Sequence, residues 1–569
     1  MIRIVRKNYL LLTLFLLSGL LFSCQKDFLG KPMSSDVTID TIFNSRIKAE
    51  TFLWNVYSTS VPMGFTYNWG TDNAPLYASM LMACCDEGEA LLGWAGSNAI
   101  NDGNWGPTNT QEDNFVWHYK GIRNANIFIA NIDRVSDITD DVKKSMKAEA
   151  SVLKALMYYD MFKRYGGVPI VDKVLLSSDK VMLPRNTVEE VVNYIVKNCD
   201  EALPFLPDVY ESKSRGRITK GAALALKSRT LLFAASPLFN TATPYLPTIE
   251  PKLVCYGNAD PNRWKLAADA AKAVLDWAAA NDCSLVTDAD PGKAYETACA
   301  QNDNSEIILA NKSQGQFWGW WSSMFGQLLL PSGIYDGWGG EYVTLNFARF
   351  YSKADGTPQT WPETGTYAEY IKKANEMEPR FQQSVWASGT KWNNEIGVRD
   401  YASMSGVGWM RKFFTRSQGG GTFINWPVFR LAEFYLNYAE ALNEFSPMDQ
   451  AAYDALNIIR NRSGVPAILN TDFRYNTQET FRQAIRRERA VELAFEEHRI
   501  FDVRRWLVAD DEGVMGGNFY GYRFAQTGGQ NTSYTKFIFE KRLWAKKMYL
   551  YPFPQSEIDK KYLTQNPGW

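Results

Sequence analysis

The sequence has few of the residues on which enzyme active sites and metal centres usually depend. Only two of its 569 residues are histidines, His118 and His498, and neither stands in an HExxH motif. GxSxG elbows, Walker loops and GxGxxG fingerprints are also missing. The seven cysteines include no CxxC pair, which argues against a zinc site or a dense disulfide framework. We therefore expect no catalytic residue, no metal and no cofactor.

Strong charge of either sign is missing as well. The formal net charge is -1 and the isoelectric point is near 6.3, so electrostatics give no reason to expect a nucleic acid partner. The adjacent pair Cys84-Cys85 is consistent with two buried thiols or with a strained disulfide, and the sequence leaves both open.

The first residues have the pattern of a bacterial lipoprotein signal. A positively charged start precedes an apolar run over residues 10–21, which is too short to span a bilayer comfortably. Ser23 then places a small residue directly before Cys24, as a lipoprotein signal peptidase requires. We expect residues 1–23 to be removed and Cys24 to carry the acyl chains of a membrane anchor. Ordinary secretion with a free thiol at Cys24 is the alternative.

Helical periodicity dominates the rest of the chain. Apolar residues recur at steps of three or four, and Thr219 and Gly464 stand where a helix cap is expected. The last two segments, joined by a Ser-Pro turn, form a helical hairpin of about 35 residues, the size of a tetratricopeptide unit without its strict signature. The segments are 142–165, 219–232, 262–278, 428–442 and 451–462.

Aromatic residues are abundant, at 14% of the chain with 19 tryptophans. Many lie in two long stretches without periodicity, residues 64–121 and 301–422, where we expect some short strands at positions that cannot be read. Loops of this length in a compact domain are usually functional. Tryptophans in polar loops can stack on the apolar faces of sugar rings while neighbouring polar groups bind the hydroxyls.

Carboxylates in the same stretches leave a hydrolase open. A glycosidase needs only two carboxylates a few ångströms apart, and Asp72, Asp86, Glu87 and Asp336 lie among the aromatic residues. We favour loop capping or hydrogen bonding to sugar hydroxyls as their role. The charged run 486–505 places opposite charges at helical spacing and is expected to form a structural ion-pair network.

Taken together, several segments resemble the SusD/RagB family of nutrient-binding outer-membrane lipoproteins. The resemblance spans nearly all of the chain after residue 23, and its segments are framework helices and turns rather than binding loops. They are 24–29 (CQKDFL), 158–169 (YYDMFKRYGGVP), 216–240 (GRITKGAALALKSRTLLFAASPLFN), 429–444 (FRLAEFYLNYAEALNE), 486–506 (RRERAVELAFEEHRIFDVRRW), 551–554 (YPFP) and 566–569 (NPGW).

This resemblance implies a mainly α, SusD-like fold. Four tetratricopeptide-like helical hairpins would pack against an irregular, loop-rich half with a few short strands. Residues 24–240 would form an N-terminal helical region with the early aromatic loop. Residues 241–569 would form a C-terminal region with the mid-chain aromatic loops and closing hairpins. The resemblance also implies no catalysis, an outward-facing lipid anchor in the outer membrane, and docking over a TonB-dependent (SusC-like) transporter.

In relatives of this kind the ligand usually lies against aromatic residues of an early and a mid-chain loop. We carry this over by region, without a one-to-one match, and residues 317–321 could equally be a packed core segment. The resemblance points to Trp69, Trp94, Asn101, Asn104 and Trp105 in the first loop, and to Trp318, Trp320, Trp321, Tyr335 and Trp338 in the second.

The leading hypothesis is a lipoprotein that captures oligosaccharides or polysaccharides at the cell surface and delivers them to the transporter. The same scaffold binding peptides, as RagB-type relatives imply, is the second. An anchored glycoside hydrolase would depend on Asp86, Glu87 or Asp336. A purely structural lid on the transporter would bind no soluble ligand.

Overall fold

The computed structural model describes residues 38–65, 76–176, 178–179, 183–312, 329–335, 337, 339–416 and 425–569. The expected signal peptide and Cys24 therefore lie outside the described residues. Several residues singled out from the sequence also lie outside them: Trp69, Asp72, Trp318, Trp320, Trp321, Asp336 and Trp338.

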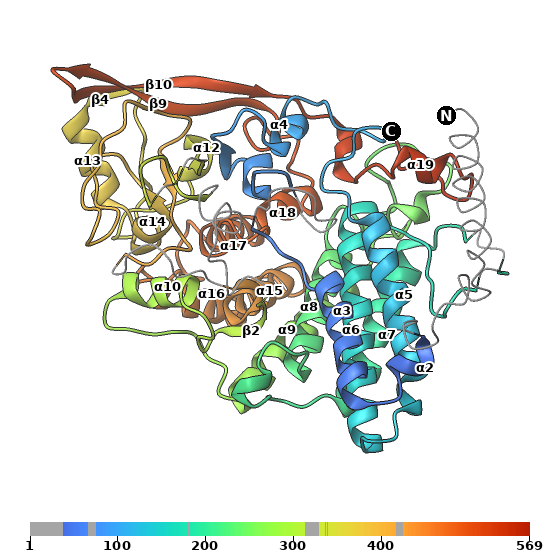
Figure 1. Ribbon diagram of the computed structural model, residues 1–569. Helices are drawn as coiled ribbons and strands as arrows, with labels where there is room; N and C mark the ends of the chain where they lie inside the picture. The colour runs from blue at the N-terminus through green and yellow to red at the C-terminus, as the bar shows by residue number, and fades with distance from the viewer. Residues whose placement is uncertain are drawn as a thin grey trace, which may run out of the picture.

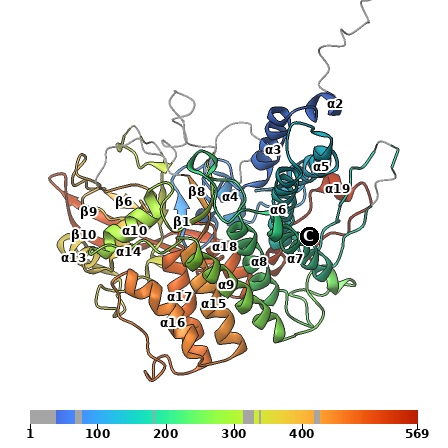
Figure 2. The ribbon, with the colours of Figure 1, turned by 90° about the horizontal axis from the view of Figure 1, so that it is seen from below.

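One half of the molecule consists of packed helices; its N-terminal helices stand upright at the right of Figure 1, and its C-terminal ones lie to the left of these, near the centre. Four helix pairs account for most of this half, and α17 (Gln478–Glu492) packs beside the last pair. Seen from below, α9, α15, α16 and α17 lie next to one another (Figure 2). The pairs are α3 (Arg46–Ser60) with α5 (Phe115–Asn131), α6 (Asp140–Tyr165) with α7 (Val188–Ala202), α8 (Lys220–Ala235) with α9 (Asn262–Ala280), and α15 (Leu431–Phe445) with α16 (Gln450–Arg462).

Local sequence signals explain where these helices begin and end. The Thr219 side chain accepts a hydrogen bond from the backbone N–H of Ala222, which confirms the expected cap of α8. Gly464 follows α16 with a φ of +71°, a conformation that glycine adopts without strain. The prediction that the helix 428–442 begins at Val428 was wrong, since α15 begins at Leu431. Val428 lies in the strand β8 (Trp426–Arg430), because residues 426–430 pair with β2 (Ile307–Asn311).

The other half is rich in loops and short elements. Its helices are short, and helices of this length depend on tertiary packing. Both stretches without periodicity hold helices that the sequence did not indicate, and α5 begins inside the first. These helices are α4 (Gly96–Asn101), α12 (Leu345–Ala348), α13 (Tyr367–Glu376) and α14 (Pro379–Ser384). The remaining α-helices of the described residues, in either half, are α2 (Ile39–Ile42), which packs on α3, and α10 (Pro291–Ala300), α18 (Arg499–Arg505) and α19 (Gln555–Ile558).

Two small antiparallel sheets organise this half. The first has the order β1-β3-β7-β5 and the second the order β4-β10-β9-β6. Most strands have two to five residues, as expected, but β9 and β10 form a long hairpin across the top of Figure 1. The strands are β1 (Gly88–Ala90), β3 (Glu341–Val343), β4 (Thr364–Thr366), β5 (Val385–Trp386), β6 (Ser403–Met404), β7 (Gly408–Met410), β9 (Gly517–Thr527) and β10 (Gln530–Arg542).

The long hairpin was not predicted, although the Gly528-Gly529 turn in the sequence indicates it. Gly528 and Gly529 have φ angles of +60° and +79°, which suit a tight two-residue connection between antiparallel strands. One hydrophobic core runs through both halves, since Leu153 of α6 and Trp386 of β5 belong to the same buried cluster. The boundary expected at residue 240 stays a prediction.

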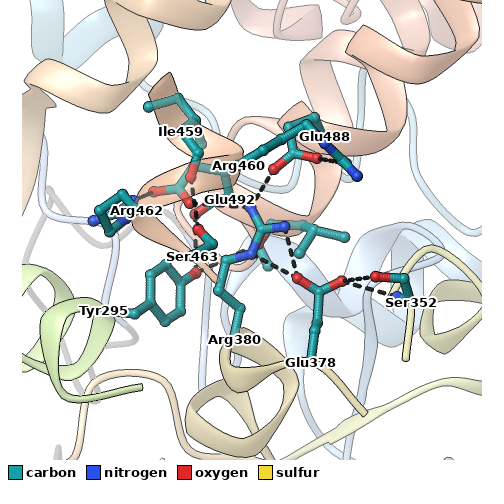
Figure 3. Close-up of polar contacts among 12 residues, drawn as sticks. Tyr295, Ser352, Glu378, Arg380, Ile459, Arg460, Arg462, Ser463, Glu488 and Glu492 are labelled. Atoms are coloured by element: carbon teal, nitrogen blue, oxygen red, sulfur yellow. Dashed lines mark hydrogen bonds and ion pairs between the residues drawn. The ribbon is translucent and has the colours of Figure 1, made fainter. Parts of the chain in front are cut away.

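Ion pairs in the interior tie the two halves together. The network expected from the charged run 486–505 is confirmed, and Figure 3 shows part of it around Arg380. Arg380 Nη1 lies 2.6 Å from Glu488 Oε1 and 3.3 Å from Glu492 Oε2. Glu492 also pairs with Arg430, at 2.8 Å, and with Arg462. Carboxylates on α17 thereby hold α14, α16 and β8 in place.

Candidate functional site

Two aromatic side chains of the early loop lie together on the surface. Tyr77 is 43% exposed and Trp94 is 45% exposed, and their ring centroids are 5.2 Å apart. The backbone N–H of Gly96 donates to the Tyr77 carbonyl over 2.7 Å. A β-carbon at Gly96 would lie 3.2 Å from the Tyr77 nitrogen, so glycine permits this close approach. The two rings therefore lie side by side on a backbone that a hydrogen bond fixes. We call them the Tyr77/Trp94 pair.

Further hydrogen bonds hold the loop that carries Trp94. The side chain of Asn98, in α4, donates to the carbonyl of Gly93 over 2.9 Å and so ties the loop to the helix that follows it. On the other side, Leu91 N–H donates to the Gly340 carbonyl over 3.1 Å, which continues the pairing of β1 with β3. The Trp94 loop thus leaves β1 where the mid-chain segment enters β3. The early and mid-chain stretches meet at this point.

Tyr335 is the expected mid-chain residue that the structure describes. It is partly buried and has a φ of +45°, an unusual conformation for a tyrosine. Its hydroxyl donates to Glu395 Oε2 over 2.8 Å and accepts from Asn393 Nδ2 over 2.7 Å. Tyr335 therefore brings a phenol, a carboxylate and an amide together on the mid-chain side of the site.

Two of the other expected site residues point inward. Trp105 is only 3% exposed and packs against Tyr551 and Trp569, with ring centroids 4.8 and 5.2 Å away. Asn101 is also buried, and its Nδ2 donates to the Ala83 carbonyl over 2.9 Å. The C-terminal segment covers this end of the loop, which the local sequence around Trp105 could not reveal. We leave both residues out of the exposed site, whereas Asn104 stays on the surface.

Tyr77 was missed because its surroundings look like core. It precedes a buried run from Met80 to Cys85, and a single aromatic residue beside such a run gives no sign of exposure. Asn393 and Glu395 were missed for a different reason. They are ordinary polar residues of a long loop, and only their hydrogen bonds to Tyr335 connect them with the site.

The carboxylates suspected of catalysis have structural partners where they are described. Both oxygens of Asp86 bind Arg499, at 2.9 and 2.7 Å. Glu87 Oε1 accepts from the backbone N–H of Phe495 over 2.7 Å, and burial raises the pKa of Glu87 to about 8. Both side chains are buried, so neither faces a ligand on the surface. A role in the frame of the protein, close to the loop-capping role we favoured, explains them better than catalysis.

His118 and the two adjacent cysteines are buried, and His498 is half-buried. His118 Nε2 lies 2.6 Å from Asp160 Oδ2, and Arg489 Nη2 lies 3.3 Å from His498 Nδ1. Cys84 and Cys85 are buried free thiols, which decides between the two states left open for them. In the parts of the chain that the structure describes, no group of three or more histidine, cysteine or acidic side chains could hold a metal ion. No helix in those parts is long and apolar enough to cross a membrane.

Two protein-family models match this sequence. A family model described as "Starch-binding associating with outer membrane" matches residues 34–232, and the model of the SusD family matches residues 305–569. The chain belongs to the SusD/RagB family. The expected relationship and the mainly α, SusD-like fold are thereby confirmed.

Individual members of the family are only distantly similar. SusD-like protein P2 of Formosa agariphila is 25% identical over 416 residues, which cover 70% of this chain and 72% of that protein. SusD-like protein P25 of the same organism is 27% identical over 111 residues, which cover 20% of this chain and about a fifth (21%) of P25.

Solved structures share the fold over nearly the whole chain. A SusD-like protein from Bacteroides fragilis has a TM-score of 0.74 at 24% identity, covering 95% of this chain and 100% of that one. A laminarin-binding SusD-like protein has a TM-score of 0.58 at 19% identity, covering 93% and 100%. At such identities the likeness establishes the fold alone.

Proposed function

We propose that the protein captures oligosaccharides at the outer surface of the outer membrane and delivers them to a TonB-dependent transporter. The Tyr77/Trp94 pair is the observation that carries this proposal. It offers apolar rings on a fixed loop, next to the segment that holds the polar group around Tyr335. One solved relative is named for binding laminarin, and the family model over residues 34–232 is named for binding starch.

The proposed mode of binding is stacking without chemistry. The apolar face of a sugar ring would lie on the indole of Trp94 or the phenol of Tyr77, and hydroxyls would reach polar groups of the two loops. A single ring buries little area, so affinity at one site is modest. Tethering many copies to one membrane raises the effective affinity for a polysaccharide with repeated epitopes.

Affinity electrophoresis tests the proposal. The mature chain, starting after residue 24, is run through gels that contain plant, host or fungal polysaccharides. We expect at least one to retard migration, and we expect Trp94→Ala and Tyr77→Ala to remove the retardation. Trp54→Ala is the matched control, because Trp54 is 44% exposed but lies on α3 in the helical half.

The outcome also separates the alternatives. Retardation that persists in both Trp94→Ala and Tyr77→Ala would contradict the assigned surface. Failure of every polysaccharide, together with binding from a peptide pool, would favour the RagB-type function. Cleavage of a polysaccharide during the run would favour the hydrolase.

The lipid anchor has its own test in whole cells. Replacing Cys24 by serine removes the thiol that would carry the acyl chains, so we expect the protein to leave the membrane fraction and appear in the soluble one. Fractionation followed by immunoblotting measures this. The released Cys24→Ser protein should still bind the same polysaccharide. Retention of the variant in the outer-membrane fraction would contradict the anchor, whereas retention in the inner membrane would mean that residues 1–23 were not removed.

A further inference from the structure

A hollow opens between α10, α13, α14 and the loop 390–394, and Asn393 in its lining is the amide that donates to Tyr335. The hollow has a volume of about 530 Å³, within the range of small-ligand pockets of about 300–1,000 Å³. Its charged lining residues are four basic ones, Lys293, Lys391, Arg411 and Arg416, and two acidic ones, Asp290 and Glu296. We call it the basic pocket.

Both acidic side chains of the basic pocket already have partners. Asp290 Oδ1 accepts from the backbone N–H of Gly292 over 2.8 Å, where it caps α10. Glu296 accepts from the backbone N–H of Arg416 over 3.2 Å and from its Nε over 3.0 Å. Lys293 pairs with Asp288 outside the lining, at 3.5 Å, so the excess positive charge of the pocket comes from Lys391, Arg411 and Arg416.

Arg411 is the most unusual of the basic residues. It is 4% exposed, and its guanidinium donates to the carbonyls of Lys391 and Trp392, at 2.8 and 2.7 Å, and to that of Gln382. Its buried Nε has no acceptor, and no carboxylate among the described residues forms an ion pair with it. Burial, with the nearby charge of Arg416, lowers the pKa of Arg411 to about 9. A buried charge without a counter-charge is costly, which favours an anion beside it.

Arg416 and Lys391 provide hydrogen-bond donors at the mouth of the pocket. Arg416 uses Nε and its backbone for Glu296, and its two terminal nitrogens donate to no acceptor in the described part of the chain. The guanidinium lies close to the start of α10, since a β-carbon at Gly292 would be 3.0 Å from Nη2. Lys391 is exposed, and its Nζ donates to Asn394 Oδ1 over 2.7 Å.

We propose that the basic pocket binds the carboxylate of an acidic sugar of the uronate class. Arg416 and Lys391 contact the carboxylate, and Arg411 supplies positive charge behind them. The amides of Gln301, Asn375 and Asn394 line the same pocket and can bind hydroxyls. This proposal rests on the proposed function in one respect, which is that the ligand bearing the carboxylate is a sugar. It adds a second site that selects charged glycans.

Calorimetric titration of the mature chain at low salt tests the inference. The probes are trigalacturonate, its fully methyl-esterified form, which keeps the shape but lacks the charges, and sodium sulfate alone. We expect trigalacturonate to bind, and the ester and sulfate to bind at least about tenfold more weakly. Arg416→Gln and Lys391→Gln should each weaken trigalacturonate about tenfold.

Two controls make the titration decisive. Arg474→Gln changes an exposed arginine that also pairs with a carboxylate, Asp472, far along the chain from the pocket residues, and it should leave binding unchanged. Trp54→Ala, which changes an exposed tryptophan of α3 outside the pocket, should also leave trigalacturonate binding unchanged. Both pocket substitutions avoid Arg411, whose guanidinium holds three backbone carbonyls and whose loss could disturb the loop.

Each contrary result overturns a definite part of the inference. No binding of trigalacturonate, or equal binding by the Arg416→Gln and Lys391→Gln variants, overturns the site. Equal affinity for the methyl ester overturns the role of the charge, and equal affinity for sulfate overturns the role of the sugar. If gel retardation depends on Trp94 but trigalacturonate does not bind, the proposed function stands and this inference fails.

Discussion

Charged side chains usually lie on the surface of a protein and aromatic ones in its core. Residues 486–506 break the first rule, and residues 76–98 break the second. In the first segment, charged side chains such as Glu488, Arg489 and Arg505 lie in the interior. In the second, Tyr77 and Trp94 lie substantially exposed. The difference teaches that partners, rather than residue type, decide where a side chain lies. The paired buried charges belong to the frame of this protein, and the exposed aromatic pair is the surface that we propose for binding.

Glu488, Arg489 and Arg505 are tolerated in the interior because each has a counter-charge at short range. Arg505 Nη1 lies 2.6 Å from Glu440, Arg505 Nε lies 2.7 Å from Asp502, and Arg489 pairs with Asp502 at 2.7 Å. Removing one member of such a pair leaves an uncompensated charge, which is far costlier than the pair itself. Tyr77 and Trp94 are substantially exposed, so we expect their replacement to affect ligand binding more than the fold.

The largest expected effect comes from breaking the frame at Glu492. This carboxylate contacts Arg380, Arg430 and Arg462, so Glu492→Ala leaves three buried guanidinium groups short of a partner. We expect a loss of about 3–5 kcal/mol in the free energy of unfolding, measured by urea denaturation. Arg474→Gln, at an exposed pair, should change it by less than about 1 kcal/mol. A loss below about 1 kcal/mol for Glu492→Ala would contradict the structural role of the network.

Two tryptophans of the early stretch sharpen the comparison. Trp105 is buried against Tyr551 and Trp569, so Trp105→Ala should lower the free energy of unfolding by about 3–5 kcal/mol. Trp94→Ala, at a 45% exposed site, should lower it by less than about 1 kcal/mol. Thermal or urea unfolding of both variants measures the difference. Equal losses would mean that Trp94 belongs to the frame.

A smaller effect is expected from pH, through Glu87. Burial raises its pKa in the folded state to about 8, from the ordinary value of 4.5, so the folded protein binds a proton that the unfolded chain releases. This contribution to stability is complete below pH 4.5 and is lost as the pH rises to 8, by roughly 3–4 kcal/mol. Glu87→Gln keeps an acceptor for the Phe495 N–H but cannot titrate. Between pH 5 and pH 8 its free energy of unfolding should therefore fall by roughly 3–4 kcal/mol less than that of the wild type.

Urea denaturation at several pH values between 5 and 8 measures this slope. An exposed glutamate, Glu201, provides the control, and Glu201→Gln should follow the wild-type slope. Parallel slopes for wild type and Glu87→Gln would show that Glu87 is charged in the folded protein.

Much of the helical half could be predicted from the sequence. The helices α6, α8 and α9 repeat apolar residues at steps of three or four, and threonine caps mark the starts of α6 and α8, so much of their course can be read from adjacent residues. The loop-rich half could not be read in this way. Its strands of two to five residues pair across long stretches of chain, as Gly88 does with Val343, and such pairing leaves no local pattern. The exception is the hairpin at Gly528-Gly529, whose signal was present.

The site was predictable as a region but not as a set of residues. Aromatic residues in polar loops indicated where to look, and the pairing of β1 with β3 brings the two loops together. Whether a given tryptophan lies inside or outside depends on distant segments. Trp105 is covered by the C-terminal residue Trp569, whereas Trp94 pairs with Tyr77 on the surface. The sequence around each tryptophan does not contain that information.

A crystal structure of the mature chain with an oligosaccharide cut from the retarding polysaccharide tests the central claim most directly. We predict a sugar ring stacked on the indole of Trp94 or the phenol of Tyr77, with the positions of Glu492 and its three arginines unchanged. A neutral oligosaccharide bound elsewhere, with both rings free of ligand, would contradict the account.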